Sequence, residues 1–213
     1  MAIDVKICGL STPETVAAAV EGGAKYVGFV FYPPSLRAVT LEQAKELAAA
    51  VPKHVKRVGL VVNPDDKTLR SIVKGGFIDL LQLHGREIPE RVAEVKKKFG
   101  LPVIKAIAIS CPDDVEAAKS YEAVADILLF DALAPEHSTT PGGNALAFDW
   151  QLIHGYVWKK PWILAGGLNV GNLQKAVLAC DATAVDVSSG VEVSRGVKSA
   201  GKIREFLKMA EML

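Results

Sequence analysis

The chain has 213 residues, half of them hydrophobic, and its 25 Lys and Arg side chains are balanced by 24 Asp and Glu. This length fits one barrel-sized domain over residues 1–213 and excludes two ordinary α/β domains, while the balanced charge gives no reason to expect nucleic acid or an anionic membrane as a partner. Three widely spaced cysteines match no disulfide framework or zinc pattern, no apolar run nears the ~20 residues of a membrane helix, and the charged start of the chain is unlike a signal peptide, so we expect a cytoplasmic protein.

Short apolar segments recur along the chain and predict eight strands. They are rich in Val, Ile, Leu and Phe without strict alternation, which is typical of strands buried on both faces of a parallel sheet. In chain order, the predicted strands are Val5–Cys8, Tyr26–Phe31, Arg57–Val62, Leu80–His84, Val103–Ile107, Ile127–Asp131, Trp162–Ala165 and Ala184–Val187.

Helix signals lie between these strands. Ser11–Glu14 offers a cap, a first-turn proline and an early acid, and Thr40–Gln43 has capping-box spacing. Further helix starts are predicted at Asn63–Asp66, Ser110–Asp113 and Asn169–Asn172. The last helix, from about Ser199 to Leu213, is amphipathic. Its apolar face consists of Ile203, Phe206, Leu207 and Ala210.

Strict alternation of strands and helices predicts all-parallel pairing, and eight such units closing on themselves give a (β/α)8 TIM barrel as the fold class. An open doubly wound sheet is the structural alternative, but it rarely needs eight evenly spaced units. The one long connection, Ala132–Phe148, is rich in proline and glycine, so we expect a mobile active-site loop there.

The carboxyl ends of barrel strands carry the active site. Polar or small residues end the predicted strands and are expected to meet at one mouth: Cys8, Arg37, Asn63, His84, Lys105, Asp131, Gly166-Gly167 and Ser188-Ser189-Gly190. The loops after the seventh and eighth strands form the usual phosphate cradle of this fold, so the two glycine-containing segments predict a phosphate site. Taken alone, Cys8 is more typical of a small buried hydrophobic residue than of a reactive thiol.

Several motifs resemble the phosphoribosylanthranilate isomerase family of tryptophan biosynthesis over nearly the whole chain. They are Lys6–Gly9, Gly28–Pro33 with Ser35 and Arg37, Val58–Asn63, Gln82–Gly85, Phe130-Asp131, Pro141–Gly143, Phe148–Trp150, Leu164–Leu168 and Val185–Glu192. The resemblance implies an aldose–ketose isomerase that carries out the Amadori rearrangement of N-(5'-phosphoribosyl)anthranilate. General acid and base catalysis suffice for this reaction, so no metal, nucleotide or flavin cofactor is implied.

The resemblance also implies roles for individual residues. Cys8 matches the general base, Asp131 the general acid, and Arg37 the arginine that engages the anthranilate carboxylate. The phosphate-binding segments match Gly166, Gly167, Ser188, Ser189 and Gly190. His84 and Asp186 match motif positions near the site, without a defined role in proton transfer.

Three positions depart from the family pattern. Leu36 precedes Arg37 where the family usually has proline, which removes a fixed φ beside the arginine. Asn144-Ala145 stand where Thr-Gly is expected, which alters how the loop closes over the substrate. Ser199 replaces a frequent aspartate and is expected to cap the last helix.

Two alternatives to this function are open. A related barrel isomerase acting on another aminated ribose phosphate would pair two aspartates and bind two phosphates, whereas the first strand here ends in Cys8. A non-catalytic barrel that binds a sugar phosphate would show erosion at the acid or the base, but both Cys8 and Asp131 are present. The sequence leaves open whether the protein is a monomer or a homodimer.

Overall fold

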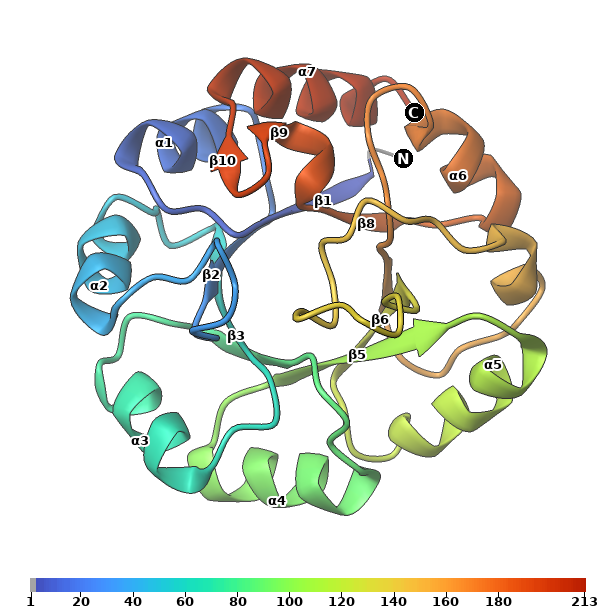
Figure 1. Ribbon diagram of the computed structural model, residues 1–213, viewed down its shortest axis with the longest axis horizontal. Helices are drawn as coiled ribbons and strands as arrows, with labels where there is room; N and C mark the ends of the chain where they lie inside the picture. The colour runs from blue at the N-terminus through green and yellow to red at the C-terminus, as the bar shows by residue number, and fades with distance from the viewer. Residues whose placement is uncertain (1–2) are drawn as a thin grey trace.

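The computed structural model describes residues 3–213 and confirms the predicted (β/α)8 barrel. Over that range, eight parallel strands close in sequence order, with β1 paired to both β2 and β8. The helices form a ring around the strands (Figure 1). The barrel strands are β1 (Asp4–Cys8), β2 (Tyr26–Val30), β3 (Lys56–Val61), β4 (Leu80–Leu83), β5 (Val103–Ile109), β6 (Ile127–Ala132), β7 (Trp162–Leu164) and β8 (Ala184–Val187).

Helix starts follow the caps expected from the sequence. The side chains of Thr12, Thr40, Asp65 and Ser199 each accept a backbone N–H of the first turn, and Thr40 forms a full capping box with Gln43. The α-helices are α1 (Pro13–Glu21), α2 (Leu41–Ala49), α3 (Asp66–Lys74), α4 (Pro89–Phe99), α5 (Pro112–Ala118), α6 (Leu173–Cys180) and α7 (Ala200–Glu211). The short 3-10 helices are η1 (Lys119–Tyr121), η2 (Trp150–Ile153) and η3 (Ser189–Val191).

Strict alternation of strands and helices was wrong in two connections. Between β6 and β7, the described chain forms a long loop and only the short η2, because a segment with several prolines and glycines does not nucleate an α-helix. After β8, η3 leads into an unpredicted hairpin of β9 (Glu192–Ser194) and β10 (Val197–Lys198) before α7 begins. Strands of two or three residues are too short to show a hydrophobic period.

The two faces of the barrel strands pack into separate apolar layers. One layer fills the barrel and consists of Val58, Leu80, Ile104, Ala106, Leu129, Ile163 and Ala165. The other lies between the strands and the helices, where Val5 and Ile7 of β1 pack. Because side chains alternate along a strand, Lys6 and Cys8 point into the barrel. By the same alternation, Lys105 follows the inward Ile104 and points outward.

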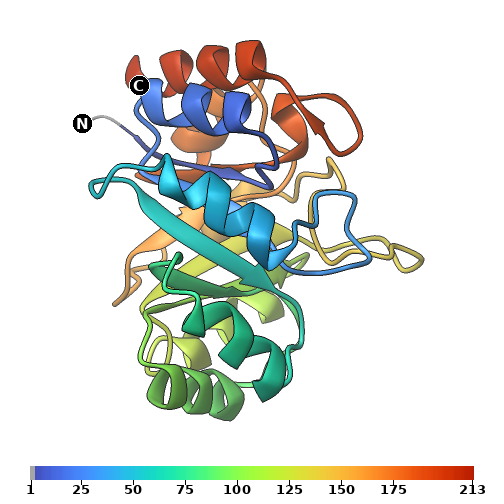
Figure 2. The same ribbon diagram turned by 90° about the vertical axis from the view of Figure 1, so that its left-hand side faces the viewer.

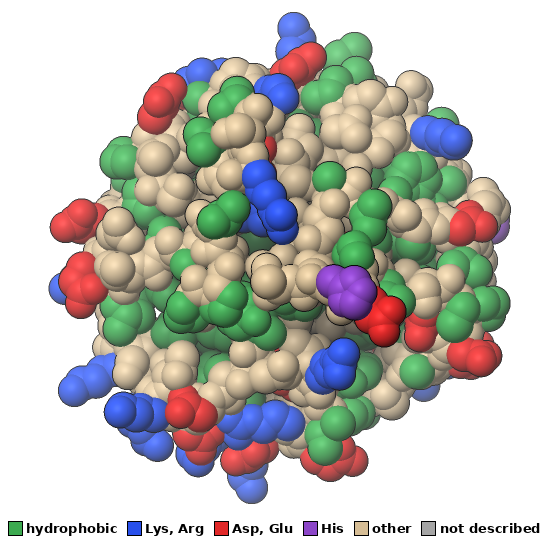
Figure 3. Space-filling model, in the orientation of Figure 1, with side chains coloured by type: hydrophobic (Ala, Val, Ile, Leu, Met, Phe, Trp, Pro, Cys, Tyr) green, Lys and Arg blue, Asp and Glu red, His purple; other side chains and the backbone are tan. Residues whose placement is uncertain are grey.

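The long loop after β6 and the β9–β10 hairpin lie on the same side of the barrel, opposite the N-terminus (Figure 2). Figure 3 shows this face, on which Lys, Arg, Asp and Glu side chains are spread around the rim and are not gathered into a patch of one sign. Within residues 3–213, no helix is long and apolar enough to cross a membrane. The carboxyl ends of the strands therefore open toward a face of mixed charge.

Candidate active site

A cavity lies at the carboxyl ends of the strands. Nine of the predicted site residues line it: Cys8, Arg37, His84, Asp131, Gly166, Gly167, Asp186, Ser188 and Ser189. Gly190 lies behind this wall, where its Cα packs so closely on the Leu168 carbonyl that a side chain would clash. Gly190 therefore joins the loops after β7 and β8, and its contact with a phosphate stays a prediction.

Cys8 lies beside a buried ion pair at the end of β1. The Nζ of Lys6 donates to Oδ1 of Asp186 at 2.9 Å, and both side chains are buried. A Cβ added to Gly28 would lie 3.2 Å from Cys8 Sγ and 3.3 Å from Lys6 Nζ, so the missing side chain leaves room for thiol and ammonium to meet. Burial raises the pKa of the Cys8 thiol, and the positive charge of Lys6 partly offsets this rise.

Lys6 stays protonated despite its burial. Desolvation lowers the pKa of its ammonium, but the interactions with Asp186 and Cys8 together outweigh desolvation and raise that pKa to about 12. A permanent cation therefore lies next to the Cys8 thiol and stabilises its thiolate form.

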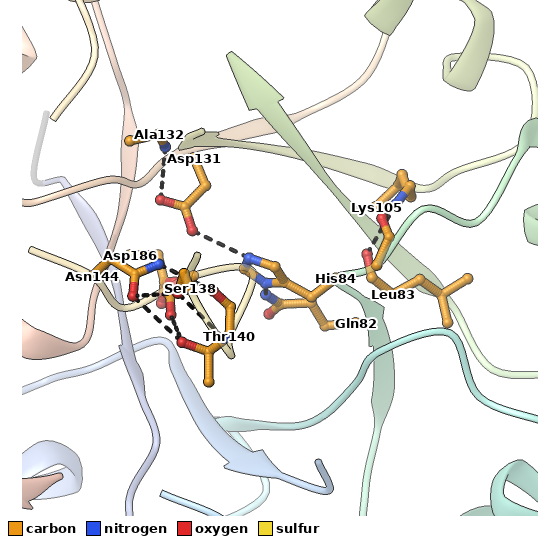
Figure 4. Close-up of polar contacts among 12 residues, drawn as sticks. Gln82, Leu83, His84, Lys105, Asp131, Ala132, Ser138, Thr140, Asn144 and Asp186 are labelled. Atoms are coloured by element: carbon orange, nitrogen blue, oxygen red, sulfur yellow. Dashed lines mark hydrogen bonds and ion pairs between the residues drawn. The ribbon is translucent and has the colours of Figure 1, made fainter. Parts of the chain in front are cut away.

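Asp131, at the end of β6, is hydrogen-bonded on both carboxylate oxygens. Its Oδ1 accepts the backbone N–H of Ala132 at 2.8 Å, and its Oδ2 lies 3.2 Å from Nε2 of His84. On the other side of the imidazole, Nε2 of Gln82 lies 2.8 Å from Nδ1 of His84. Figure 4 shows Gln82, His84 and Asp131 in a row across the barrel from β4 to β6.

Arg37 is held by a carboxylate that the sequence analysis did not identify. Its Nε donates to Glu192 Oε1 at 2.6 Å, and its Nη2 donates to Glu192 Oε2 at 3.0 Å. Lys198 also donates to Glu192, at 2.6 Å, and to the carbonyl and hydroxyl of Ser188. Burial raises the pKa of Glu192, but the bonds from Arg37 and Lys198 outweigh burial and lower it to about 2. Two cations share one carboxylate, which leaves net positive charge for an anionic ligand.

The loop after β6 lies across the mouth of the cavity. A Cβ on Gly142 would lie 2.7 Å from His84 Nε2 and 2.8 Å from Asp131 Oδ2, so the bare backbone rests directly on this pair. Asn144 donates to the Thr140 carbonyl at 3.1 Å, which ties the loop to itself (Figure 4). Ala145 has a φ of 58°, a left-handed conformation that glycine adopts more easily.

The predicted phosphate end of the cavity has a backbone that only glycine adopts without strain. Gly166 and Gly167 both have positive φ, at 85° and 62°. A Cβ on Gly167 would lie 2.8 Å from the backbone nitrogen of Ala147, so the loop after β6 also rests on this segment. Ser188 and Ser189 complete the wall, and Lys198 adds a cation beside Ser188.

Four polar residues of the site carried no predicted role: Lys6, Gln82, Glu192 and Lys198. Lys6 and Asp186 had a usable signal, because charges inside apolar strands must be paired when they are buried. Glu192 ends the motif Val185–Glu192 but was given no role, and Lys198 had no signal, since it lies in the unpredicted hairpin. Lys105, expected at the mouth, instead pairs with Glu87 on the helix side at 2.8 Å.

Asn63 does not line the main cavity and instead fixes the neighbouring loop. Its side-chain oxygen accepts the backbone N–H of Arg86 at 2.7 Å. Among residues 3–213, no group of three or more His, Cys, Asp or Glu is arranged to hold a metal ion.

A family model described as N-(5'phosphoribosyl)anthranilate (PRA) isomerase matches residues 5–209. The chain is 52% identical over 210 residues to the N-(5'-phosphoribosyl)anthranilate isomerase of Paracoccus denitrificans, with 99% of this chain and 98% of the relative covered. Identity to the same enzyme of Paramagnetospirillum magneticum is 50% over 210 residues, with the same shares covered.

Solved structures of the same family also match this chain. The crystal structure of phosphoribosyl anthranilate isomerase from Thermotoga maritima matches with a TM-score of 0.88 and 36% identity, covering 99% of this chain and all of that one. A phosphoribosyl anthranilate isomerase in complex with reduced 1-(o-carboxyphenylamino)-1-deoxyribulose 5-phosphate matches with a TM-score of 0.85 and 35% identity, covering 99% of this chain and 100% of that one.

Proposed function

The chain belongs to the N-(5'-phosphoribosyl)anthranilate isomerase family, and on that premise we propose how its cavity carries out the reaction. It is an aldose–ketose isomerase that converts N-(5'-phosphoribosyl)anthranilate to 1-(2-carboxyphenylamino)-1-deoxyribulose 5-phosphate. The observation that carries our proposal is that Cys8 on β1 and Asp131 on β6 line one cavity. An acid and a base facing one sugar are what this rearrangement requires.

Asp131 acts as the general acid in this proposal. Its protonated carboxyl group donates to the ring oxygen of the ribose, the bond between C1 and that oxygen breaks, and a Schiff base forms between C1 and the anthranilate nitrogen. The bonds from Ala132 and His84 support this role by holding the carboxyl group toward the cavity. After the proton has left, the same two contacts stabilise the carboxylate.

Cys8 acts as the general base. Its thiolate removes the proton from C2 of the Schiff base and gives an enolamine, in which C1 gains the electrons that C2 loses. A proton then adds at C1 and the C2 hydroxyl proton is lost, which leaves the ketone. No external oxidant or reductant enters this balance. The neighbouring Lys6 supports the role of Cys8, because an adjacent cation stabilises the thiolate.

The two anionic ends of the substrate orient the reacting carbons. We assign the anthranilate carboxylate to Arg37, whose guanidinium is fixed by Glu192 and retains N–H groups that the carboxylate of Glu192 does not use. We assign the phosphate to Gly166, Gly167, Ser188, Ser189 and Gly190, where Lys198 supplies a nearby positive charge. Binding at both ends holds C1 and C2 between Cys8 and Asp131.

We further propose that the enzyme acts in the cytoplasm on this small molecule, without nucleic acid or membrane, as a monomer or homodimer. The balanced charge and the face without a one-sign patch support this proposal (Figure 3). A similar crystal structure is of monomers generated from the dimeric phosphoribosylanthranilate isomerase of Thermotoga maritima, so both states occur with this fold. Sedimentation of the purified chain distinguishes them.

Turnover by the wild-type chain tests the proposed function. Phosphoribosylanthranilate is generated in place because it is labile, and the loss of its anthranilate-type fluorescence is followed over time. Rapid loss that depends on enzyme concentration is expected. If the substrate is not consumed and only raises the unfolding temperature, the chain is a sugar-phosphate binder. Turnover of a different aminated ribose phosphate in its place would assign the barrel to another isomerisation.

A further inference from the structure

Gln82 has a buried amide oxygen without a partner. The side chain extends from β4 into the barrel and is completely buried. Its Nε2 lies 2.8 Å from Nδ1 of His84, while its Oε1 has no hydrogen-bond partner among residues 3–213. Buried polar atoms are rarely left unpaired in native proteins, so this oxygen calls for an explanation in terms of function.

The present orientation of the amide fixes the proton count of the neighbouring pair. Because Nε2 of Gln82 donates, Nδ1 of His84 must be unprotonated, and the imidazole proton lies on its Nε2. That Nε2–H donates to the Asp131 carboxylate at 3.2 Å. The pair of His84 and Asp131 then holds one proton, and Asp131 has none to give to a substrate.

A half-turn of the amide gives the opposite arrangement. The oxygen and nitrogen exchange places with almost no change in shape, so no backbone movement is needed. Oε1 of Gln82 then accepts from a protonated Nδ1, and a second proton lies between His84 Nε2 and Asp131 Oδ2. In each orientation, the amide atom of Gln82 that points away from His84 is unpaired, so this cost is the same for both. The number of protons on the His84–Asp131 pair therefore decides which orientation is favoured.

We propose that Gln82 is a positioning residue that turns its amide nitrogen or its amide oxygen toward His84, so that the His84–Asp131 pair can hold one proton or two. The two-proton form is the one in which Asp131 has a proton to donate to the ribose oxygen. Donation leaves the proton on Nδ1 in place, and uptake of a proton between His84 Nε2 and Asp131 Oδ2 restores that form. This inference rests on the proposed function, because it explains how the acid is reloaded between turnovers.

The surroundings of His84 single out Gln82 for this task. The titratable and charged side chains that share cavities with His84 are Asp131, Cys8, Tyr32, Arg37, Arg86 and Asp186. Lys105 donates to the carbonyls of Leu83 and Gly85 on either side of His84, but its charge is paired with Glu87. Among the described residues, Gln82 alone hydrogen-bonds Nδ1.

Two substitutions of Gln82 are expected to act in opposite directions. Gln82→Met removes both the donor and the acceptor at similar length, so a proton on Nδ1 loses its partner. Gln82→Glu keeps the shape and supplies an acceptor, as the carboxylate of a catalytic triad does for its histidine. The ring nitrogens of His84 are followed by nitrogen-15 NMR as the pH is lowered. His54, His137 and His154 serve as internal references.

In Gln82→Met, His84 is expected to take up its second proton about one pH unit lower than in wild type, since a hydrogen bond to a charged group is worth at least about tenfold in proton affinity. In Gln82→Glu, it is expected to do so about one unit higher. We expect kcat to fall about tenfold or more in Gln82→Met with KM within about twofold, and to be largely retained in Gln82→Glu. Gln151→Met, at a glutamine outside the cavity, should change neither readout.

The inference would be overturned if the pH at which His84 takes up its second proton shifted in the same direction in both variants, or shifted in neither. A glutamine with a merely structural role would not make the two substitutions shift this pH in opposite directions. If Gln82→Met does not fold, kcat of Gln82→Glu still decides, because a loss of about tenfold or more there contradicts a role in which an acceptor at this position suffices. The NMR measurement needs no substrate, so it tests the role of Gln82 independently of the proposed function. An unresponsive His84 in an active enzyme overturns the role of Gln82 alone, whereas a responsive His84 without wild-type turnover overturns the function.

Discussion

Each buried charge at the site is paired with an opposite charge, and one member of each group is still placed to interact with a catalytic side chain or an anionic ligand. Lys6 is neutralised by Asp186, yet its ammonium also reaches the Cys8 thiol. Glu192 is shared by Arg37 and Lys198, so its cluster keeps a net positive charge. An unpaired charge at these depths would cost several kcal/mol, whereas paired charges can be aimed at a substrate.

The first prediction concerns Lys6→Met. Lys6 lowers the pKa of the Cys8 thiol, so its removal raises that pKa above an already raised value. In the proposed mechanism Cys8 works as a thiolate, so the rise of kcat/KM with pH should move about one unit or more toward higher pH. The pH profile is the readout, because the unpaired Asp186 also destabilises the fold.

Lys25→Met is the control for this change, since Lys25 forms an exposed ion pair with Asp4 outside the cavity. That variant should keep the wild-type pH profile. A folded, active Lys6→Met enzyme with an unshifted profile would show that Lys6 does not support the base.

The second prediction concerns Glu192→Gln and acid stability. Folding lowers the pKa of Glu192 from its usual 4.5 to about 2, so the ionised form favours the folded state. Its contribution is fully present above pH 4.5 and is lost as the pH falls toward 2. The urea midpoint, measured over this range, should fall less steeply with acid in Glu192→Gln. If the urea midpoint fell with decreasing pH equally steeply in the variant and in the wild type, Glu192 would not contribute to the loss of stability in acid.

At the scale of elements, the loop after β6 is the part of the barrel that touches both ends of the site. Gly142 rests on Asp131, Gly143 accepts from Arg37 at 3.2 Å, and the following backbone covers Gly167. The loop thus contacts the proposed acid, the arginine proposed to bind the carboxylate and the segment proposed to bind the phosphate. Closing it excludes water from the reacting carbons.

The third prediction is that Gly142→Ala impairs catalysis and leaves the fold intact. The added Cβ would come within 2.8 Å of His84 and Asp131, while the φ of Gly142 lies outside the left-handed region and accepts alanine. We expect kcat/KM to fall about tenfold or more, with the free energy of unfolding changed by less than about 0.5 kcal/mol. Steady-state kinetics and urea unfolding measure the two effects.

Gly201→Ala is the matched control, because its added Cβ would meet only Ser199 Oγ at 3.7 Å. It should leave kcat/KM unchanged. Wild-type activity in Gly142→Ala would mean that the loop does not close on this pair during turnover.

The barrel strands could be predicted to within two residues because each is a buried run between caps and turns. Cys8 and Asp131 could be predicted to face one mouth because strand ends converge in a barrel. The prediction placed Lys105 on the wrong face of its strand. The sequence indicates where a strand lies, but the alternation of side chains along the strand decides whether a residue points into the barrel or outward. The Arg37–Glu192 pair joins residues 155 positions apart, and no local pattern encodes such a contact.

For the molecule as a whole, closure of the barrel ties the two ends of the chain together. β1 pairs with β8, and the first and last helices, α1 and α7, pack against each other. The proposed base Cys8 and the proposed acid Asp131 come from β1 and β6, so no contiguous half of the chain contains both of them. We therefore propose that residues 1–213 form one catalytic domain.

The fourth prediction follows from this proposal. The three tryptophans, Trp150, Trp158 and Trp162, report on the region around β7, whereas far-ultraviolet circular dichroism reports on all helices. If the barrel is one cooperative unit, the urea transitions by fluorescence and by circular dichroism should coincide. Separated midpoints would divide the chain into independently unfolding parts.

Turnover of phosphoribosylanthranilate by Cys8→Ala and Asp131→Ala, measured beside the wild type, tests whether these two side chains are the base and the acid. We expect each folded variant to lose about 10²- to 10⁴-fold in kcat, the usual contribution of a general acid or base. Both should still bind reduced 1-(o-carboxyphenylamino)-1-deoxyribulose 5-phosphate, because Arg37 and the phosphate-binding segments are unchanged. Wild-type turnover in either variant would contradict the acid–base assignment.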